Sequence, residues 1–508
     1  MLNPSSPNSS NSPTAFTTMV ASMKETFQSG VSRKREWRVD QLKRMIAMFE
    51  ENRSEWELAQ EKDLAQTQPL KTTEVNMPIH SAHYLLDNLN RLMATESVPI
   101  TNTGNIPAEG FIVKEPLGVV LIIGAWNYPI SLMGIPFAGA LAAGNLVILK
   151  PSEVSPNCSA LFAKLVPKYF DEKYVRCVEG DASVSTELLK EPYDHIFYTG
   201  SIRVGKIIMR AASEHLTPVT LELGGKSPLI LDSDIDCTVA ANRITWGKTF
   251  NCGQTCVAPD YILLDSAVAD KFIPALEKAI TQMYGEDASK SPDYSRIVSV
   301  NHTKRLKGMI DQVKDKVIYG GNVDENAKYV QPTLVLNPDL DNDLVMQEEI
   351  FGPIMPIIIY GEKKSDKYPS KLANLDAALK FINSRSKPLA LYIYTKNQAL
   401  VEKIMHITQS GAVGINECVM QVAEELLPFG GVGYSGMGAY HGDSSFYTFT
   451  HKKSVLKKKY WLDLDLRYPP LTETKKKLLI TALSDNFLTR YIMPVGGWLL
   501  SIVNKCLK

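Results

Sequence analysis

The stretch GVVLIIGAWNYPISLMGIPFAGALAAGNLVILK, residues 118–150, decides the fold. It starts with a continuous apolar run rich in branched side chains at 118–124, which is typical of a strand that is covered on both faces. A segment with a helical pattern at 130–143 leads to a second apolar run, LVILK at 146–150. Strand, helix and strand in this order predict one unit of a doubly wound α/β sheet.

Further elements continue this alternation on both sides of the stretch. Strands are expected at 195–200 (HIFYTG) and 228–232 (PLILD), with helical patterns between them. Upstream, apolar residues recur at helical spacing from Val39 to Phe49, which predicts one long amphipathic helix over 37–64. The fold class is therefore α/β.

Length and charge exclude some classes of protein. A chain of 508 residues predicts two or three folding units. Its 55 basic and 55 acidic residues cancel, so charge gives no attraction to nucleic acid, and we expect no nucleic-acid partner. The seven cysteines are odd in number and scattered, which indicates a reducing compartment rather than a disulfide framework.

The two ends of the chain differ from the rest. The first residues are rich in Ser, Asn and Pro and carry no signal-peptide pattern, so a disordered tail is predicted. Near the other end, five lysines within 452–459 and KKK at 475–477 precede an apolar run at 491–503. That run is short for a spanning helix of roughly 20 residues, whereas lysines beside apolar segments suit an anionic membrane surface. The alternative is that this tail packs on the body or on a second subunit.

Two cysteines four positions apart, Cys252 and Cys256, occur in FNCGQTCVAP at 250–259. The spacing allows a metal half-site, a redox pair, a nucleophile with a bystander, or two buried thiols. A metal centre needs more ligands, and the sequence offers no Cys-x-x-Cys and no His pairing beside these two cysteines, so no metal is expected.

Two polar residues, Glu222 and Asn127, are candidates for a catalytic role. Glu222 lies in TLELGGKSP, where burial raises the pKa of a carboxyl toward the range of a general base, although most such acids are surface residues. Asn127 in WNYP directly follows the first strand, where an amide donor can stabilise an oxyanion. A loop or cap role is the alternative for Asn127.

Two further motifs suit a dinucleotide, and a third, QEEIFGP, is merely structural when taken alone. Lys150 and Glu153 in KPSE end the second strand and can hold a ribose or phosphate, or form an ion pair at a Pro turn. GSIRVG at 200–205 follows another strand and opens a helix, although it lacks the full glycine fingerprint. QEEIFGP at 347–353 is expected to be a strand that runs into a Gly-Pro turn.

The joint order of these motifs carries a resemblance. WNYP, LKPSE, YTGSIRVG, LELGGKSP, GQTCVAP, EEIFGP and LPFGGVGYSGMGAYHG together look like an NAD(P)-dependent aldehyde dehydrogenase, most similar to the class 3 or fatty aldehyde branch. The resemblance runs from about residue 20 to about residue 470. It implies the aldehyde dehydrogenase fold: a Rossmann-like cofactor domain, an α/β catalytic domain and a small bridging β element.

The resemblance also implies the catalytic roles. Cys256 matches the family's nucleophile, and Cys252 occupies a position that the family does not require, which suits a small packing residue. The side chain of Asn127 and the backbone N–H of Cys256 then hold the thiohemiacetal oxyanion, and Glu222 activates the water that hydrolyses the thioester.

NAD is the implied cofactor, with NADP as a possible second. Lys150 and Glu153 match the adenine-ribose contacts, and Glu153 favours free ribose hydroxyls and hence NAD. The remaining cofactor-binding positions are at the pyrophosphate and nicotinamide side: Trp126, Gly200, Ser201, Gly205, Glu349 and Phe351.

By the same resemblance the domains are expected as follows: a disordered tail at 1–18, an NAD-binding domain at 19–97 and 119–222, bridging strands at 98–118 and 444–458, a catalytic domain at 223–443, and a gatekeeper and membrane-associating tail at 459–508. The partners are an aldehyde substrate, a second copy in a homodimer and a membrane surface or anchor. The expected place is a cytosol-facing membrane, the endoplasmic reticulum first, and otherwise the cytoplasm.

The sequence departs from the family before LPFGG, where NECVMQVAEELLPFGG at 416–431 carries Glu417 in place of the usual Asp and two extra acids. Medium- to long-chain fatty aldehydes are the expected substrates. The alternatives are a general class 3 enzyme for aromatic and short aldehydes, an acylating enzyme that releases acyl-CoA, and a catalytically idle membrane-bound homologue. Glu222, as the hydrolytic base, favours release of the free acid.

Overall fold

The predicted strand, helix and strand form as β3 (Val119–Ile123), α5 (Ser131–Ala143) and β4 (Leu146–Lys150). They are seen in a computed structural model of the chain, which describes residues 14–102, 105, 108–362, 365–461 and 467–483. The two strands are parallel and in register from Val119 opposite Leu146 to Ile123 opposite Lys150. Every residue of both strands is buried, which is why the sequence shows continuous apolar runs instead of alternation.

These strands lie at the centre of a six-stranded sheet in the order β17-β7-β6-β3-β4-β5. All neighbours are parallel except β17, which runs antiparallel to β7. The chain adds β4 and β5 on one side of β3 and then β6 and β7 on the other, so the order reverses beside β3 and the doubly wound prediction is confirmed. The remaining strands of this sheet are β5 (Val175–Cys177), β6 (His195–Thr199), β7 (Val219–Glu222) and β17 (Gly436–Met437).

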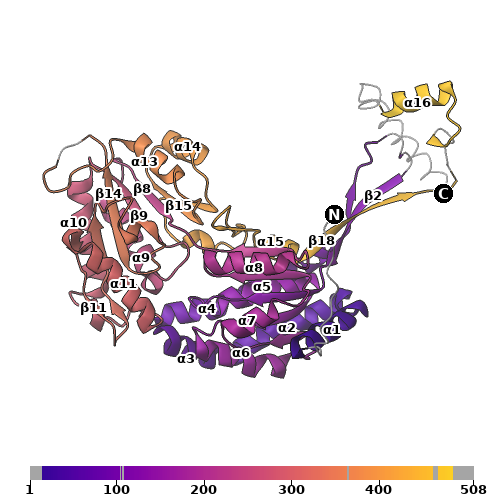
Figure 1. The fold of residues 1–508 in the computed structure, drawn as a ribbon, viewed down its shortest axis with the longest axis horizontal. Helices are drawn as coiled ribbons and strands as arrows, with labels where there is room; N and C mark the ends of the chain where they lie inside the picture. Colours follow the sequence, from indigo (N-terminus) through magenta and orange to yellow (C-terminus); the bar gives the residue numbers. More distant parts are fainter. Residues whose placement is uncertain (1–13, 103–104, 106–107, 363–364, 462–466, 484–508) are drawn as a thin grey trace, which may run out of the picture. The chain divides into compact units, whose positions relative to one another are not determined.

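Helices from the first half of the chain cover this sheet, and Figure 1 draws them in indigo to magenta. They are α1 (Ala15–Gln28), α2 (Arg35–Glu51), α3 (Arg53–Leu64), α4 (Gln68–Met93), α6 (Pro156–Tyr169), α7 (Ala182–Leu188) and α8 (Ile202–Ser213), in addition to α5.

The prediction of one long helix over 37–64 is wrong in one respect, because the chain forms two helices there, α2 and α3, which are separated at Asn52. Asn52 leaves the helical region, with φ −112° and ψ 22°. Its side-chain amide donates to the Met48 carbonyl and to the Tyr169 hydroxyl, both over 2.9 Å. An Asn side chain that competes for backbone partners ends a helix even where the apolar spacing continues.

The predicted N-terminal tail is also shorter than expected. Residues 1–13 lie outside the described part of the chain, but Thr14 caps α1, which begins at Ala15. The helix is held by Val20 and Met23, whose side chains are almost fully buried. Residues 15–18 therefore belong to a packed helix.

A second sheet has seven strands in the order β10-β13-β14-β9-β8-β15-β16, parallel throughout except for β10. The predicted strand at 228–232 is β8 and belongs to this sheet, not to the first. The strands are β8 (Pro228–Leu231), β9 (Tyr261–Asp265), β10 (Val317–Tyr319), β13 (Thr333–Leu336), β14 (Ile354–Tyr360), β15 (Ala390–Tyr394) and β16 (Ala412–Ile415), and β11 (Val323–Asp324) pairs with β12 (Tyr329–Val330) beside them.

The helices between β8 and β16 in sequence are drawn in magenta to orange in Figure 1. They are α9 (Cys237–Thr249), α10 (Ala269–Tyr284), α11 (Val300–Gln312), α12 (Leu344–Gln347), α13 (Leu375–Asn383) and α14 (Gln398–Ile407). Short 3₁₀ turns at Phe250–Gly253 and Met420–Ala423 complete this region.

A separate unit comprises residues 89–116 and 450 onward. Here β2 (Ala108–Pro116) pairs with β1 (Glu96–Val98) and, antiparallel, with β18 (Thr450–Lys458). The predicted bridging strand at 444–458 starts too early, because α15 (Gly442–Thr448) occupies its beginning. This helix packs on α5, where an added Cβ at Gly139 would come within 3.0 Å of the Ser445 side chain.

The last described helix is α16 (Glu473–Leu483). None of the helices in the described ranges is long and apolar enough to cross a membrane. The apolar run at 491–503 lies outside the described residues.

Candidate active site

Cys256 lies in a sharp loop between α9 and β9, called here the cysteine loop (residues 250–259). Asn251, Cys252 and Gly253 all adopt left-handed backbone angles, with φ 48°, 55° and 75°. Successive left-handed residues are rare and are found where a site constrains the chain. The side chain of Cys256 is only partly buried, whereas the residues around it are buried.

The electrostatic setting of Cys256 favours the neutral thiol. Burial raises the pKa of the thiol to about 12, and the carboxylates of Glu349 and Glu222 add to the rise. The backbone N–H groups of Cys256 and Val257 oppose it, because they stabilise the thiolate. Reactivity of this sulfur therefore depends on how those N–H groups are held and on the charge of the two carboxyls.

Cys252 has a different environment, although it is only four positions away. It is fully buried in the apolar core of the second sheet, and burial raises the pKa of its thiol to about 12. Its side chain meets Tyr294, another member of that core. Both cysteines are free thiols. This arrangement supports the reading of Cys252 as a packing residue.

Asn127 is brought to the cysteine loop from the end of β3. Its side-chain amide donates to the Gln254 carbonyl over 3.0 Å. Its own carbonyl accepts from the side chains of Asn251 (2.8 Å) and Gln66 (3.4 Å). The amide has two N–H bonds, so one remains for another acceptor near Cys256.

Glu222 is the last residue of β7 and is 2% exposed. Neither carboxyl oxygen has a hydrogen-bond partner among the described residues. Burial raises the pKa of this carboxyl well above its usual range, and its charge in turn raises that of Cys256. A buried carboxyl of this kind, within electrostatic reach of a thiol, has the properties of a general base.

The segment 347–353 contains Glu349 and Phe351, and the expected strand before its turn is wrong: α12 ends at Gln347 and β14 starts only at Ile354. Glu349 accepts a hydrogen bond from Gly225 N–H over 3.1 Å. Burial and then the charge of Asp260 raise the pKa of its carboxyl to about 8. Phe351 has φ 49°, and its ring meets the Trp126 ring edge-on at 5.3 Å between centroids. Two predicted cofactor residues, Trp126 and Phe351, are thus in contact, and the third, Glu349, lies within electrostatic reach of Cys256.

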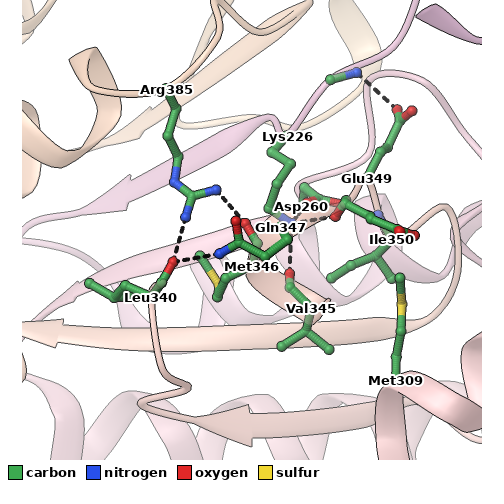
Figure 2. A network of polar contacts seen from close by, with 12 residues as sticks. Lys226, Asp260, Met309, Leu340, Val345, Met346, Gln347, Glu349, Ile350 and Arg385 are labelled. Carbon is green, nitrogen blue, oxygen red and sulfur yellow. Dashed lines mark hydrogen bonds and ion pairs between the residues drawn. The ribbon is translucent and has the colours of Figure 1, made fainter. Parts of the chain in front are cut away.

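A network that the sequence did not reveal holds this segment, and Figure 2 shows it. Lys226 forms a buried ion pair with Asp260 and donates to the carbonyls of Val345 (2.6 Å) and Glu348 (2.9 Å). The other oxygen of Asp260 accepts from Ile350 N–H over 3.0 Å. Burial lowers the pKa of Lys226, and the charge of Asp260 opposes that effect. Lys226 stands in the quoted motif LELGGKSP and Asp260 directly follows GQTCVAP, but nothing local indicates that they pair across 34 positions.

Arginines hold the longer segment at 340–350 from other elements. Arg385 donates to the carbonyls of Leu340 (2.8 Å) and Met346, and Arg305 donates to those of Glu349 (3.3 Å) and Ile350. Every one of these acceptors is a backbone carbonyl. The segment is therefore fixed by its main chain.

Another unpredicted residue, Glu74, binds the backbone a few residues after Asn127. The carboxyl of Glu74, from α4, is fully buried and accepts from the backbone N–H groups of Ile130 (2.7 Å) and Ser131 (3.1 Å) at the start of α5. Burial raises its pKa to about 7, and these two donors limit the rise. A single acid within a helical pattern carries no signal of such a role in sequence.

Three of the predicted dinucleotide positions, Lys150, Ser201 and Gly205, lie at or just after the carboxyl ends of β4 and β6 in the first sheet, beside the point where strand order reverses. Lys150 is 1% exposed and donates to the Pro151 carbonyl (2.8 Å) and to Glu153 (3.4 Å). Ser201 caps α8 directly after β6. Gly205 lies on Leu223, where an added Cβ would come within 2.8 Å.

These residues fit a dinucleotide. Open α/β sheets bind such ligands at the switch point, and the start of α8 offers backbone N–H groups to an anion. The Thr199 hydroxyl at the end of β6 is buried without a partner in the described residues, so a polar ligand group can satisfy it.

Comparison with known proteins agrees with this geometry. A sequence model of the aldehyde dehydrogenase family matches residues 9–455. The chain is 44% identical over 459 residues to "Aldehyde dehydrogenase family 3 member A2" of Rattus norvegicus, covering 90% of this chain and 92% of the relative. It is 45% identical over 451 residues to "Aldehyde dehydrogenase, dimeric NADP-preferring" of Rattus norvegicus, covering 88% and 96%.

A solved structure is similar over nearly the whole chain. The substrate-bound state of Staphylococcus aureus AldH superimposes with a TM-score of 0.87 at 38% identity, covering 92% of this chain and 99% of that one.

Proposed function

The chain belongs to the aldehyde dehydrogenase family and is an NAD(P)-dependent oxidoreductase, and from that premise we propose that it converts medium- to long-chain fatty aldehydes into carboxylic acids. The observation that carries the proposed chemistry is the setting of Cys256. Its loop is bonded to the amide of Asn127, and its thiol responds to the buried carboxyl of Glu222.

Each residue has a defined task in the proposed reaction. The sulfur of Cys256 bonds to the aldehyde carbon, and the free N–H of the Asn127 amide and the backbone N–H of Cys256 stabilise the oxyanion. Bound NAD(P)⁺ supplies the acceptor for the hydride that leaves the aldehyde carbon. Glu222 in its charged form removes a proton from the water that hydrolyses the Cys256 thioester, and the free acid leaves.

The substrate class is supported by a cavity of about 270 Å³ beside the cysteine loop, whose lining combines large apolar side chains with polar groups such as Asn251 and Asp293. Its wall includes Trp246, Phe250, Leu70 and Met283. The Phe250 ring contacts Trp246 at 4.9 Å and stacks on Tyr128 at 6.4 Å between centroids. Surfaces of this kind favour an alkyl chain over a small polar aldehyde.

For the cofactor we propose NAD first and NADP second. Lys150 and Glu153 face the adenine ribose, and a carboxylate at Glu153 hydrogen-bonds free hydroxyls but repels a phosphate. Trp126, Glu349 and Phe351 face the nicotinamide side, and Gly200, Ser201 and Gly205 face the pyrophosphate. One relative is named NADP-preferring, so initial rates with both cofactors are the direct test.

We further propose a homodimer on a cytosol-facing membrane, with the endoplasmic reticulum as the first choice. A C2 dimer is the common closed assembly, and one relative is named dimeric. The unit with β18 exposes lysines next to Trp461, Leu478 and Ile480, which are 65%, 53% and 67% exposed. Lysines attract anionic lipid at about 1 kcal/mol each, and the apolar side chains enter the interface.

The activity test is NAD(P)H formation with saturated aldehydes of increasing chain length, with benzaldehyde alongside and detergent present. Rates that rise with chain length support the fatty aldehyde proposal, and a preference for benzaldehyde or short chains contradicts it. Added coenzyme A that yields a thioester product would contradict release of the free acid. Binding of the full chain and of a chain ending at residue 470 to anionic vesicles tests the part of the tail after residue 470, and equal binding overturns a membrane role for that part.

A further inference from the structure

The hydroxyl of Tyr392, on β15, lies between the cysteine loop and a turn at 418–421. It donates a hydrogen bond to the Val257 carbonyl over 2.6 Å. It accepts one from Val419 N–H (3.2 Å) and one from the side chain of Gln421 (3.0 Å). One donated and two accepted bonds use the full capacity of a phenol, and the residue is completely buried.

The ring that carries this hydroxyl is fixed by the second sheet. Tyr392 pairs with Leu229 of β8 on one side and with Gly414 of β16 on the other. The ring lies so close to Gly414 that an added Cβ there would come within 2.7 Å of it. The position of the hydroxyl is therefore set by the sheet, and the loop and the turn are both bonded to a rigid point.

At one end, this bond acts on the residue next to the thiol. The N–H of Val257 is one of the two backbone groups that lower the pKa of Cys256, and Tyr392 holds the carbonyl of that same residue. A residue held at its carbonyl has less freedom to rotate its N–H away from the sulfur. The bond thus favours the geometry in which Val257 stabilises a thiolate.

At the other end, the bond acts on a strained turn. Val419 has φ 67°, which a β-branched residue rarely adopts and which surrounding contacts must maintain. Its neighbour Cys418 packs on α9, where an added Cβ at Gly247 would come within 2.6 Å of the Cys418 Cβ. The helix α9 leads directly into the cysteine loop. The 418–421 turn therefore contacts the structure that supports the loop at two places, Tyr392 and α9.

We propose that Tyr392 is a positioning residue for Cys256, and that its hydroxyl couples the position of the 418–421 turn to the reactivity of the thiol. This rests on the proposed function only in naming Cys256 as the nucleophile. Tyr392 exchanges no proton with substrate, because burial raises the pKa of its hydroxyl and keeps it neutral. The turn carries the half-exposed Met420, so changes on the surface of the turn reach the thiol through Tyr392.

The test is Tyr392→Phe, which removes the hydroxyl and keeps the ring on Gly414. Alkylation of Cys256 by iodoacetamide is followed against pH by mass spectrometry of the peptide that carries it, alongside kcat and KM. We expect the alkylation profile to move to higher pH, kcat to fall about 10- to 100-fold, and KM for the dinucleotide to stay within about twofold. Tyr360→Phe is the matched control, because Tyr360 is buried and donates to the Leu231 carbonyl (3.2 Å) on a strand of the same sheet. The Tyr360→Phe variant should leave the alkylation profile and kcat unchanged.

A Tyr392→Phe protein with the wild-type alkylation profile and kcat overturns the inference, and so does an equal change in Tyr360→Phe. If wild type forms no NAD(P)H with any aldehyde, the proposed function fails, while the alkylation profiles still decide on Tyr392. Should Tyr392→Phe not fold, Gln421→Leu deletes one bond to the hydroxyl without touching the sheet. It is expected to move the profile in the same direction and to lower kcat about 2- to 10-fold, and an unchanged profile overturns the inference.

Discussion

The side chain of Asn251 donates a hydrogen bond to the backbone carbonyl of Asn127 over 2.8 Å, while the Asn127 side chain donates to the Gln254 carbonyl over 3.0 Å. The proposed oxyanion donor and the cysteine loop are thus joined in both directions. The end of β3 in the first sheet and the loop before β9 of the second sheet meet at this point. The accuracy of the site depends on these two bonds, because a misplacement of about 1 Å costs about 100-fold in rate.

Asn251→Gly tests the hydrogen bond from the Asn251 side chain to the Asn127 carbonyl without changing the backbone conformation at residue 251. Glycine tolerates the left-handed φ of 48°, so the loop keeps its path, but the bond to Asn127 is lost. We expect kcat/KM to fall about 10-fold. Asn251→Ala should lose more, because alanine also disfavours this φ. Equal activity of wild type and the Gly variant in steady-state assays would show that the bond is dispensable.

The two cysteines are expected to respond in opposite ways. Cys256→Ala should abolish NAD(P)H formation and leave the unfolding midpoint close to that of wild type. Cys252→Ala should retain the activity and lose about 1 to 2 kcal/mol of stability, because it leaves a small cavity in the core of the second sheet. Assays and urea unfolding of both variants check this, and an active Cys256→Ala protein would refute the mechanism.

Glu74 predicts a pH dependence of stability. Its pKa is about 7 in the folded chain against an ordinary value of 4.5, so the folded state binds the extra proton between these values. Stability should therefore fall as pH rises from about 4.5 to about 7, and level off above. Glu74→Gln keeps an acceptor for Ile130 and Ser131 and cannot ionise. We expect it to be more stable than wild type by about 1 to 3 kcal/mol at pH 8, and to approach wild type at pH 5. Urea unfolding at the two pH values measures the difference, and the same difference at both would exclude Glu74 as the source.

The pair of Lys226 and Asp260 should show strong coupling. Their side chains are 10% and 4% exposed, so Lys226→Met leaves an unpaired buried carboxylate and is expected to cost about 3 to 5 kcal/mol. Lys226→Met combined with Asp260→Asn removes both charges and keeps an acceptor for Ile350 N–H. The double variant should be more stable than Lys226→Met alone. A double-mutant cycle by thermal or urea unfolding decides this, and additive losses would argue against a coupled pair.

Local patterns in the sequence predicted the strands well, because burial on both faces leaves uninterrupted apolar runs such as those of β3 and β4. The same reading missed the break at Asn52, where a side chain competes for backbone partners inside an otherwise regular apolar spacing. Motif order gave Cys256, Glu222 and Asn127 by resemblance, and the structure brings Asn127 to the cysteine loop and Glu222 within electrostatic reach of the thiol. Glu74, Asp260 and Tyr392 were missed, because each depends on a partner far away in the chain.

The segment at 340–350 is held by Lys226, Arg385 and Arg305, and each of them binds its backbone carbonyls. A carbonyl belongs to every amino acid, so a substitution in this segment removes none of these acceptors. Glu349, which we propose to face the dinucleotide, can therefore be replaced between descendants of one ancestor without loss of these backbone acceptors. Substitutions in this segment can therefore change cofactor preference with little loss of stability. Substitutions of Lys226, Arg385 or Arg305 would instead remove the donors that hold the segment.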